Sequence, residues 1–198
     1  VPQTLVNDIV NRLQDYVFFG DYCIRYWEDL FPKKYQKTKQ DVLFILSETI
    51  GEIWEKLNGL TIQYTFYQNK LINVYEVYIE NYPMLYVVLS DSCMNYNIYQ
   101  KMKVATYDTF LSLCYGLSFI NMKHIKKQRL LSLCYLLNQI KEDTHPLMNR
   151  YTLPCYGKQL TIEDIRRRRD KDKKKFRYKP SLKKIKKKLT TRKRIKSR

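Results

Sequence analysis

The stretch Leu60–Pro83, LTIQYTFYQNKLINVYEVYIENYP, decides the fold class of this 198-residue chain. Its apolar and aromatic residues recur at steps of 4, 3, 4, 3, 4 and 4, which is the spacing of one face of an α-helix. The β-branched and aromatic content of Thr61–Phe66 also suits a strand. Because the helical spacing is sustained, the stretch predicts a helix that ends at Pro83. The residues that carry the spacing are Leu60, Tyr64, Tyr67, Leu71, Val74, Tyr78 and Tyr82.

The segments on either side show the same helical period. A first helix is expected over Val6–Val17 with Thr4 as its cap, and Asp21 can open a short second helix. Asp41–Leu57 predicts a third helix, because its apolar residues alternate at steps of three and four. The helical pattern then continues to Asp143, with breaks expected near 90–97 and 121–123.

A five-residue sequence, Leu-Ser-Leu-Cys-Tyr, occurs at Leu111–Tyr115 and again at Leu131–Tyr135. The two copies could mark a repeated pair of helices, or they could simply share residues that suit a core. The uncharged stretch Thr109–Met122 is too short for a membrane-spanning helix and predicts a core helix. The predicted fold class is therefore all-α, a bundle of about six or seven helices.

The positive charge is concentrated at one end of the chain. Lys and Arg number 37 against 19 Asp and Glu, a formal net charge of +18. Residues 1–157 hold 16 basic and 15 acidic side chains, whereas residues 158–198 hold 21 basic and 4 acidic ones. The sequence predicts a nearly neutral helical body, 1–157, and a basic nucleic-acid-binding tail, 158–198, that is partly helical or disordered. Thr161 and Asp164 have the spacing of a helix cap within that tail.

The tail predicts contact with nucleic acid, because each cation that neutralises a phosphate releases counterions. Two aromatic residues among the cations could stack on unpaired bases. RNA is favoured over DNA, since no helix-turn-helix, zinc-finger or leucine-zipper signature is present. The residues predicted to bind nucleic acid are Arg166, Arg167, Arg168, Arg169, Lys173, Lys174, Lys175, Phe176, Arg177, Tyr178, Lys183, Lys184, Lys186, Lys187, Lys188, Arg192, Lys193 and Arg194.

No motif in the sequence predicts chemistry. The chain contains no glycine-rich phosphate-binding loop, no H-E-x-x-H pair and no closely spaced Cys and His ligands. The sequence therefore predicts no catalytic residue, no metal, no cofactor and no enzymatic activity. The five cysteines are expected to be buried thiols in a reducing intracellular compartment, with structural disulfides as the less favoured alternative.

These observations favour a non-enzymatic RNA-binding subunit of a ribonucleoprotein assembly, nuclear or nucleolar, whose helical body contacts protein partners. The alternative is a structural or adaptor subunit of a nuclear or virion scaffold. Its basic tail would then be a nuclear import signal, or would pack on an acidic partner or on packaged DNA. A hydrolase or nuclease that uses carboxylates of the body is a third possibility. No transmembrane segment is expected, and peripheral membrane contact is disfavoured because the apolar stripe of Leu182, Ile185 and Leu189 is short.

Overall fold

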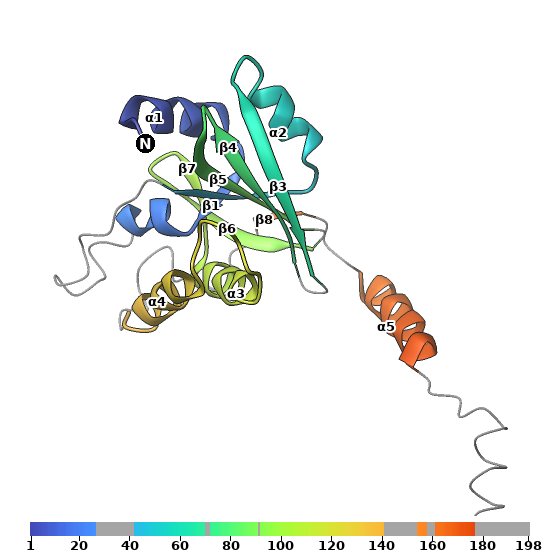
Figure 1. The fold of residues 1–198 in the computed structure, drawn as a ribbon. Coiled ribbons are helices and arrows are strands. Elements are labelled where there is room, and N and C mark those ends of the chain that lie inside the picture. Colours follow the sequence, from blue (N-terminus) through green and yellow to red (C-terminus); the bar gives the residue numbers. More distant parts are fainter. Residues whose placement is uncertain (27–41, 70–71, 91, 141–153, 158–160, 177–198) are drawn as a thin grey trace, which may run out of the picture. The chain divides into compact units, whose positions relative to one another are not determined.

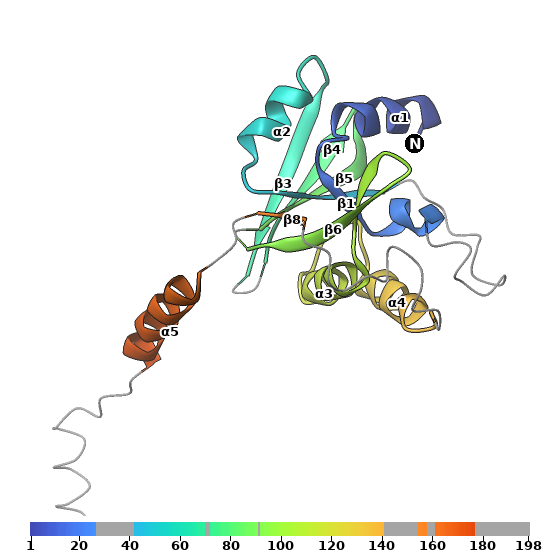
Figure 2. The ribbon, with the colours of Figure 1, turned by 180° about the vertical axis from the view of Figure 1, so that it is seen from behind.

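The computed structural model describes residues 1–26, 42–69, 72–90, 92–140, 154–157 and 161–176. The chain divides into two compact units, Val1–Gln159 and Leu160–Arg198. In the first unit an eight-stranded mixed sheet has helices on both faces (Figures 1 and 2). No helix within the described ranges is both long enough and apolar enough to cross a membrane.

The sheet has the strand order β3-β4-β5-β2-β1-β7-β6-β8. Strand β2 runs parallel to β5 and antiparallel to β1, and β1 runs parallel to β7, whereas the remaining pairs are antiparallel. The elements, in chain order, are α1 (Gln3–Arg12), β1 (Val17–Phe19), the 3₁₀-helix η1 (Asp21–Tyr26), β2 (Leu43–Ser47), α2 (Gly51–Lys56), β3 (Ile62–Gln68), β4 (Asn73–Ile79), β5 (Tyr82–Leu89), β6 (Met94–Tyr99), β7 (Met102–Ala105), α3 (Tyr107–Leu117), α4 (Lys127–Leu137), β8 (Cys155–Tyr156) and α5 (Ile162–Phe176).

The core lies around β1 and β2, where every residue of both strands is buried. Strands buried on both faces are continuous apolar runs with no alternation of polar residues. Helices α1 and α2 lie on one side of this sheet and α3 and α4 on the other (Figures 1 and 2). The stacked rings of Phe44 and Tyr86, 4.9 Å apart, continue the core from β2 into β5.

The predicted all-α bundle is wrong, because Leu60–Pro83 forms β3, β4 and the start of β5. In the β3–β4 ladder Tyr64 lies opposite Val77 and Tyr67 lies opposite Val74, so the two tyrosines point to opposite faces of the sheet. Strand β3 carries aromatic residues at odd and even positions alike, with Tyr64 and Phe66 on one face and Tyr67 on the other. This removes the two-residue period of a strand and produces the spacing that had indicated a helix.

Two tight turns were missed because neither contains glycine. Glu80 and Asn81 connect β4 to β5, and Gln100 and Lys101 connect β6 to β7; all four residues have positive φ angles between 49° and 68°. Two left-handed residues in succession form the two-residue turn that matches strand twist, for which Asn-Gly is the usual sequence signal. The carboxylate of Glu80 also accepts a hydrogen bond from the Thr61 amide, which ties this turn to the start of β3.

Of the other predicted helices, some are present in the structure and one is not. The predicted core helix of Thr109–Met122 corresponds to α3, and the two copies of Leu-Ser-Leu-Cys-Tyr lie on the neighbouring helices α3 and α4. The first helix ends at Arg12, and Pro2, rather than Thr4, is its N-cap. The predicted helix of Asp41–Leu57 is wrong, because its described part divides into β2 and α2.

Replacement of Gly20 by alanine should destabilise the first unit by about 2–4 kcal/mol. Gly20 has φ = +75°, and a Cβ there would collide with the buried ring of Phe44. Gly51→Ala is the matched control, because a Cβ at this helical position meets nothing within 4 Å and alanine favours a helix. Urea unfolding of both variants measures the difference, and equal midpoints would contradict the described turn at Gly20.

Candidate nucleic-acid interface

Helix α5 of the second unit begins with the predicted cap. The Thr161 hydroxyl donates to Asp164 Oδ2 over 2.8 Å and accepts from the Asp164 amide over 3.2 Å, while the Thr161 amide donates to the same carboxylate oxygen. This reciprocal arrangement satisfies amide groups that the first turn of a helix leaves open. The capping prediction is therefore confirmed.

The four arginines Arg166–Arg169 occupy consecutive positions of α5 and are exposed. Because each residue advances by about 100° around a helix, their guanidinium groups surround the helix instead of sharing one face. Arg167 and Glu163 approach only to 4.0 Å, and Arg169 and Asp170 only to 3.9 Å. Such loose, exposed ion pairs hold the cations weakly, so phosphate can displace the carboxylates.

The structure places the other predicted tail residues as follows. Lys173, Lys174, Lys175 and Phe176 lie within the bounds of α5, although their side chains are outside the description. The predicted residues that lie outside the described residues are Arg177, Tyr178, Lys183, Lys184, Lys186, Lys187, Lys188, Arg192, Lys193 and Arg194.

A second set of cations lies in the first unit, on the turn that connects α3 to α4. Lys123, Lys126 and Lys127 are all exposed on this turn. The Phe119 ring is 67% exposed beside them, with the Lys127 ammonium 5.9 Å from its centre. We define Phe119–Lys127 as the basic turn. Its cations match phosphate and its exposed ring matches a base, whereas the residues predicted from the sequence to bind nucleic acid all lie in the tail.

The basic turn is fixed to the sheet by a buried carboxylate. Glu76 on β4 is fully buried, and its Oε1 accepts hydrogen bonds from the amide and Nδ1 of His124, each over 3.1 Å. Oε1 and Oε2 also accept from the phenols of Tyr86 and Tyr67, each over 2.7 Å. The Lys123 amide donates in turn to the Tyr67 hydroxyl. Two successive amides of the basic turn are thus bound to the sheet.

The hydrogen bonds around Glu76 favour its ionised form. Burial by itself would raise the pKa of this carboxyl group, but the donors Tyr67, Tyr86 and His124 outweigh burial and lower it. Burial and the bond to Glu76 raise the pKa of Tyr67 to about 12, so this phenol remains a donor at neutral pH. Because an ionised carboxylate only accepts, Nδ1 of His124 carries the proton that points toward Glu76.

A second buried carboxylate anchors α4. Asp21, which directly follows β1 and Gly20, forms an ion pair with Arg129 on α4. Burial raises the pKa of Asp21 to about 6, and Arg129 opposes that rise. Both buried carboxylates of the described residues therefore connect the sheet to the α3–α4 segment, Glu76 within the basic turn at His124 and Asp21 just after it at Arg129.

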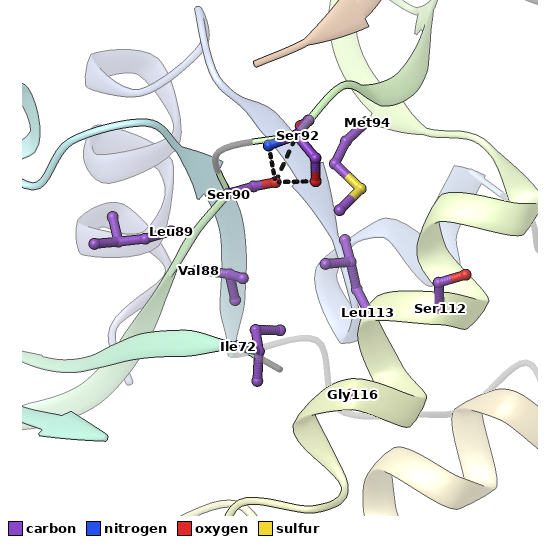
Figure 3. A pocket seen from close by; sticks show the side chains of 9 residues that line it. All are labelled: Ile72, Val88, Leu89, Ser90, Ser92, Met94, Ser112, Leu113 and Gly116. Carbon is purple, nitrogen blue, oxygen red and sulfur yellow. Dashed lines mark hydrogen bonds between the residues drawn. The ribbon is translucent and has the colours of Figure 1, made fainter. Parts of the chain in front are cut away.

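A cavity of about 290 Å³ lies where β5 ends, beside the start of β6 and α3 (Figure 3). Its walls are mainly apolar, with Ser90, Ser92 and Ser112 as the polar members, and the Ser90 hydroxyl already donates to the Ser92 carbonyl. No charged side chain lines it. The cavity therefore lacks the cationic side chains that bind the phosphates of a nucleoside triphosphate, and it is not part of the candidate interface.

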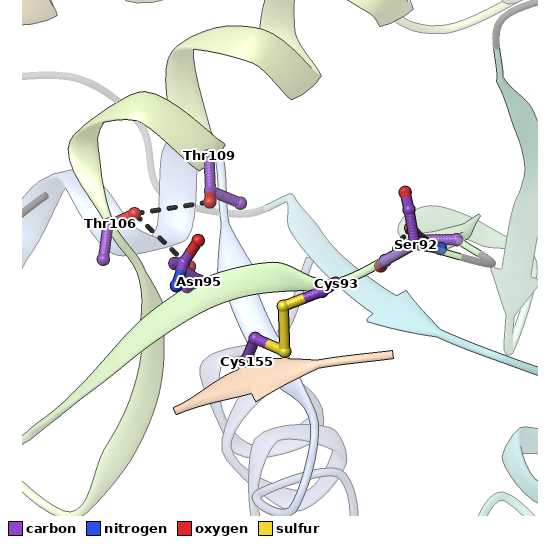
Figure 4. Close-up of a disulfide and its surroundings, with 7 residues drawn as sticks. Ser92, Cys93, Asn95, Thr106, Thr109 and Cys155 are labelled. Atoms are coloured by element: carbon purple, nitrogen blue, oxygen red, sulfur yellow. Dashed lines mark hydrogen bonds between the residues drawn. A yellow bond between two sulfur atoms is a disulfide. The ribbon is translucent and has the colours of Figure 1, made fainter. Parts of the chain in front are cut away.

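The cysteines do not all behave as predicted. Cys93 and Cys155 form a disulfide that joins β8 to the segment leading into β6 (Figure 4), so the prediction of buried thiols is wrong for these two. It is confirmed for Cys23, Cys114 and Cys134, which are free and buried. The Cys114 and Cys134 thiols, from the two copies of Leu-Ser-Leu-Cys-Tyr, share a hydrogen bond between α3 and α4.

Glu76→Gln should destabilise the first unit by about 2–3 kcal/mol at pH 7, because charge-assisted hydrogen bonds from two phenols and His124 are lost. A carboxyl group whose pKa is lowered by folding stabilises the fold above its unfolded pKa, and that contribution is lost as the pH falls through the folded pKa. The difference between the parent and Glu76→Gln should therefore shrink below about pH 4.5. Urea unfolding at several pH values measures it.

The exposed Glu55 on α2 provides the control. Glu55→Gln should leave the unfolding midpoint close to that of the parent at every pH. A gap between the parent and Glu76→Gln that widens toward low pH would contradict the described bonding of Glu76.

No family model matches the chain, and no curated protein matches it either. Among solved structures, the chain resembles the crystal structure of the Megavirus polyadenylate synthase, with a TM-score of 0.56 and 14% sequence identity. The likeness covers 85% of this chain and 40% of that one, so the chain spans less than half the length of its structural neighbour. At this identity the likeness establishes the fold.

This finding corrects the functional predictions. The non-enzymatic RNA-binding subunit and its scaffold alternative combined the basic tail with an all-α body, and both are contradicted because the body is a mixed sheet that resembles the fold of an enzyme, a polyadenylate synthase. The prediction that the chain is no enzyme is overturned on the same ground. The predicted contacts with protein partners are unsupported, because they were assigned to a helical body that the chain does not have. The nuclear or nucleolar location stays a prediction.

Proposed function

We propose that this chain acts as an RNA nucleotidyltransferase that extends RNA 3′ ends with adenylate. The observation that carries this proposal is the likeness to a polyadenylate synthase over 85% of the chain. The two groups of exposed cations, on α5 and on the basic turn, support it because an RNA substrate brings a phosphate at every nucleotide.

The proposed reaction forms one bond and breaks one. The 3′ hydroxyl oxygen of the RNA attacks the α-phosphorus of ATP, a new P–O bond forms, and the bond from that phosphorus to the pyrophosphate oxygen breaks. Pyrophosphate leaves with the electron pair, and the hydroxyl proton passes to a base. Catalysis of such a transfer consists mainly of positioning the reactants and stabilising charge.

The cations of this chain would hold the RNA. Arg166–Arg169 surround α5 and contact phosphates without choosing among sequences, because phosphate contacts carry no base information. The basic turn adds a position for one base on Phe119, beside Lys127. The amides of Lys123 and His124, bound to Tyr67 and Glu76, hold this contact in place on the sheet.

Nucleotidyl and phosphoryl transfer commonly use divalent metal ions held by carboxylates. Within the described ranges, no group of three or more His, Cys, Asp or Glu side chains could hold a metal ion. The buried carboxylates there, Glu76 and Asp21, already bind protein donors. The described residues do not fit a metal centre, and no step is assigned to one. The acidic residues that lie outside the described ranges are Glu28, Asp29, Asp41, Asp91, Glu142 and Asp143.

The full chain should incorporate adenylate from labelled ATP into a single-stranded RNA primer in the presence of Mg²⁺ or Mn²⁺. Replacing Arg166–Arg169 by glutamine should raise the KM for RNA by about ten- to a hundredfold and flatten the salt dependence, by about 0.7 in the log–log slope per lost phosphate contact. The KM for ATP should stay unchanged. Lys101→Gln, in the exposed β6–β7 turn, is the control.

Two outcomes would contradict this proposal in separable ways. RNA binding without incorporation under any of these conditions would overturn the enzymatic part. Failure of the full chain to bind RNA at physiological salt would overturn the substrate.

Lys126→Glu with Lys127→Glu should weaken binding of single-stranded RNA about tenfold or more, because two cations become anions. The double change should fold well, since Lys126 is the N-cap of α4 and Lys127 its first residue, where negative charge suits the helix dipole. Fluorescence anisotropy with labelled RNA measures the affinity. Lys101→Glu is a charge reversal outside the basic turn, and an equal loss of affinity per reversed charge in the two variants would remove the basic turn from the interface.

A further inference from the structure

Strand β3 has the properties of a strand that another strand covers. It is the last strand in the sheet order, and β4 is its one partner among the described strands. Its seven residues, IQYTFYQ, include no charged residue and no proline, although 28% of the chain is charged. Its register with β4 is uninterrupted by a bulge. Open edge strands usually carry a charge, a proline or a bulge, because these prevent pairing with a further strand.

The backbone pattern shows which residues of β3 face the open edge. The Glu80 amide donates to the Thr61 carbonyl over 3.0 Å, and the Asn69 amide donates to the Ile72 carbonyl over 3.2 Å, both in register with the β3–β4 ladder. Hydrogen-bonded pairs alternate along an antiparallel ladder. Thr65, four residues from each of these positions, therefore directs its amide and carbonyl toward β4, whereas Tyr64 and Phe66 direct theirs toward the open edge.

Side chains at this edge are already held in position. Tyr64 stacks on Trp54 of α2 with the ring centres 5.2 Å apart, and Phe66 lies 4.6 Å from the ring of Tyr75 on β4. Both rings remain well exposed, Tyr64 at 56% and Phe66 at 42%. Rings fixed in this way lose little conformational freedom when a further surface covers them.

We propose that β3 pairs with β3 of a second copy of this chain, antiparallel about a two-fold axis at Thr65. This register pairs all seven residues of the strand with residues of the same strand in the second copy. Tyr64 of each copy then lies opposite Phe66 of the other, in a pair that uses the open backbone groups, and Thr65 lies opposite Thr65. Aromatic pairs across strands stabilise a sheet.

The composition of β3 favours a second copy over a strand of other composition. A two-fold axis places each side chain opposite its mirror position in the strand, so any charged residue near the centre would face a like charge. No like charges would meet, because the central residues of β3 are uncharged on both faces: Gln63, Thr65 and Tyr67 on one, and Tyr64 and Phe66 on the other. The pattern is also matched in size about Thr65, with an aromatic ring on either side.

Sedimentation velocity of the full, nuclease-treated chain tests the proposal. The chain should be a dimer at roughly micromolar concentrations, and Thr65→Lys should raise the dimer dissociation constant at least about tenfold, because two lysines then lie directly opposite. The exposed Ile98 on β6 gives the matched control, and Ile98→Lys should leave the dimer intact. Thr65→Lys should retain RNA binding, so this test is independent of the proposed function.

A cysteine at the axis tests the register. The Cα atoms of directly opposite, non-hydrogen-bonded residues are about 4.5 Å apart, which suits a disulfide. Thr65→Cys should therefore form an intermolecular disulfide on mild oxidation with copper phenanthroline, whereas Gln63→Cys, which faces Tyr67 of the second copy, should not. A monomer at all concentrations would overturn the proposal. A dimer broken by Ile98→Lys but not by Thr65→Lys, or cross-linked through Gln63→Cys alone, would do the same.

Discussion

Complete burial of β1 and β2 is the constraint on which the rest of this structure depends. A strand with no exposed residue needs an apolar layer on each face, and the chain supplies α1 and α2 for one face and α3 and α4 for the other. Strand β2 also makes the sheet a mixed one, because it runs parallel to β5 and antiparallel to β1. Gly20 and Phe44 meet where β1 ends, so the contact between these two strands leaves no space for a side chain at position 20.

The same burial links stability to the candidate interface. Glu76 and Asp21 sit under apolar layers, where a carboxylate is tolerated only with partners, and each finds its partner on the α3–α4 segment. The basic turn is held at His124 by Glu76, and α4 just after it is held at Arg129 by Asp21, while the turn's lysines are exposed. Substitutions at the buried Tyr86 or the half-buried Tyr67 would therefore act on the proposed RNA contact through the loss of this support.

The sequence predicted the helices better than the strands, for physical reasons. Helices α3 and α5 have an apolar stripe or a capping box, signals that depend only on neighbours in the chain. Strands β3 and β4 have apolar residues on both faces, so their two-residue period is lost, and the turns at Glu80–Asn81 and Gln100–Lys101 lack the usual glycine. Arg166–Arg169 could be recognised in the sequence by their charge alone. The basic turn could not, because it is held in place by Glu76, which lies 47 residues before Lys123 in the chain.

The Cys93–Cys155 disulfide gives the first unit a closed covalent ring. Its two cysteines are 62 residues apart, and the segment between them contains β6, β7, α3, the basic turn and α4. A single cut anywhere in that segment leaves both fragments joined through sulfur, so a nicked molecule keeps its mass until the bond is reduced. The segment that carries the basic turn is thereby covalently fixed at both of its ends.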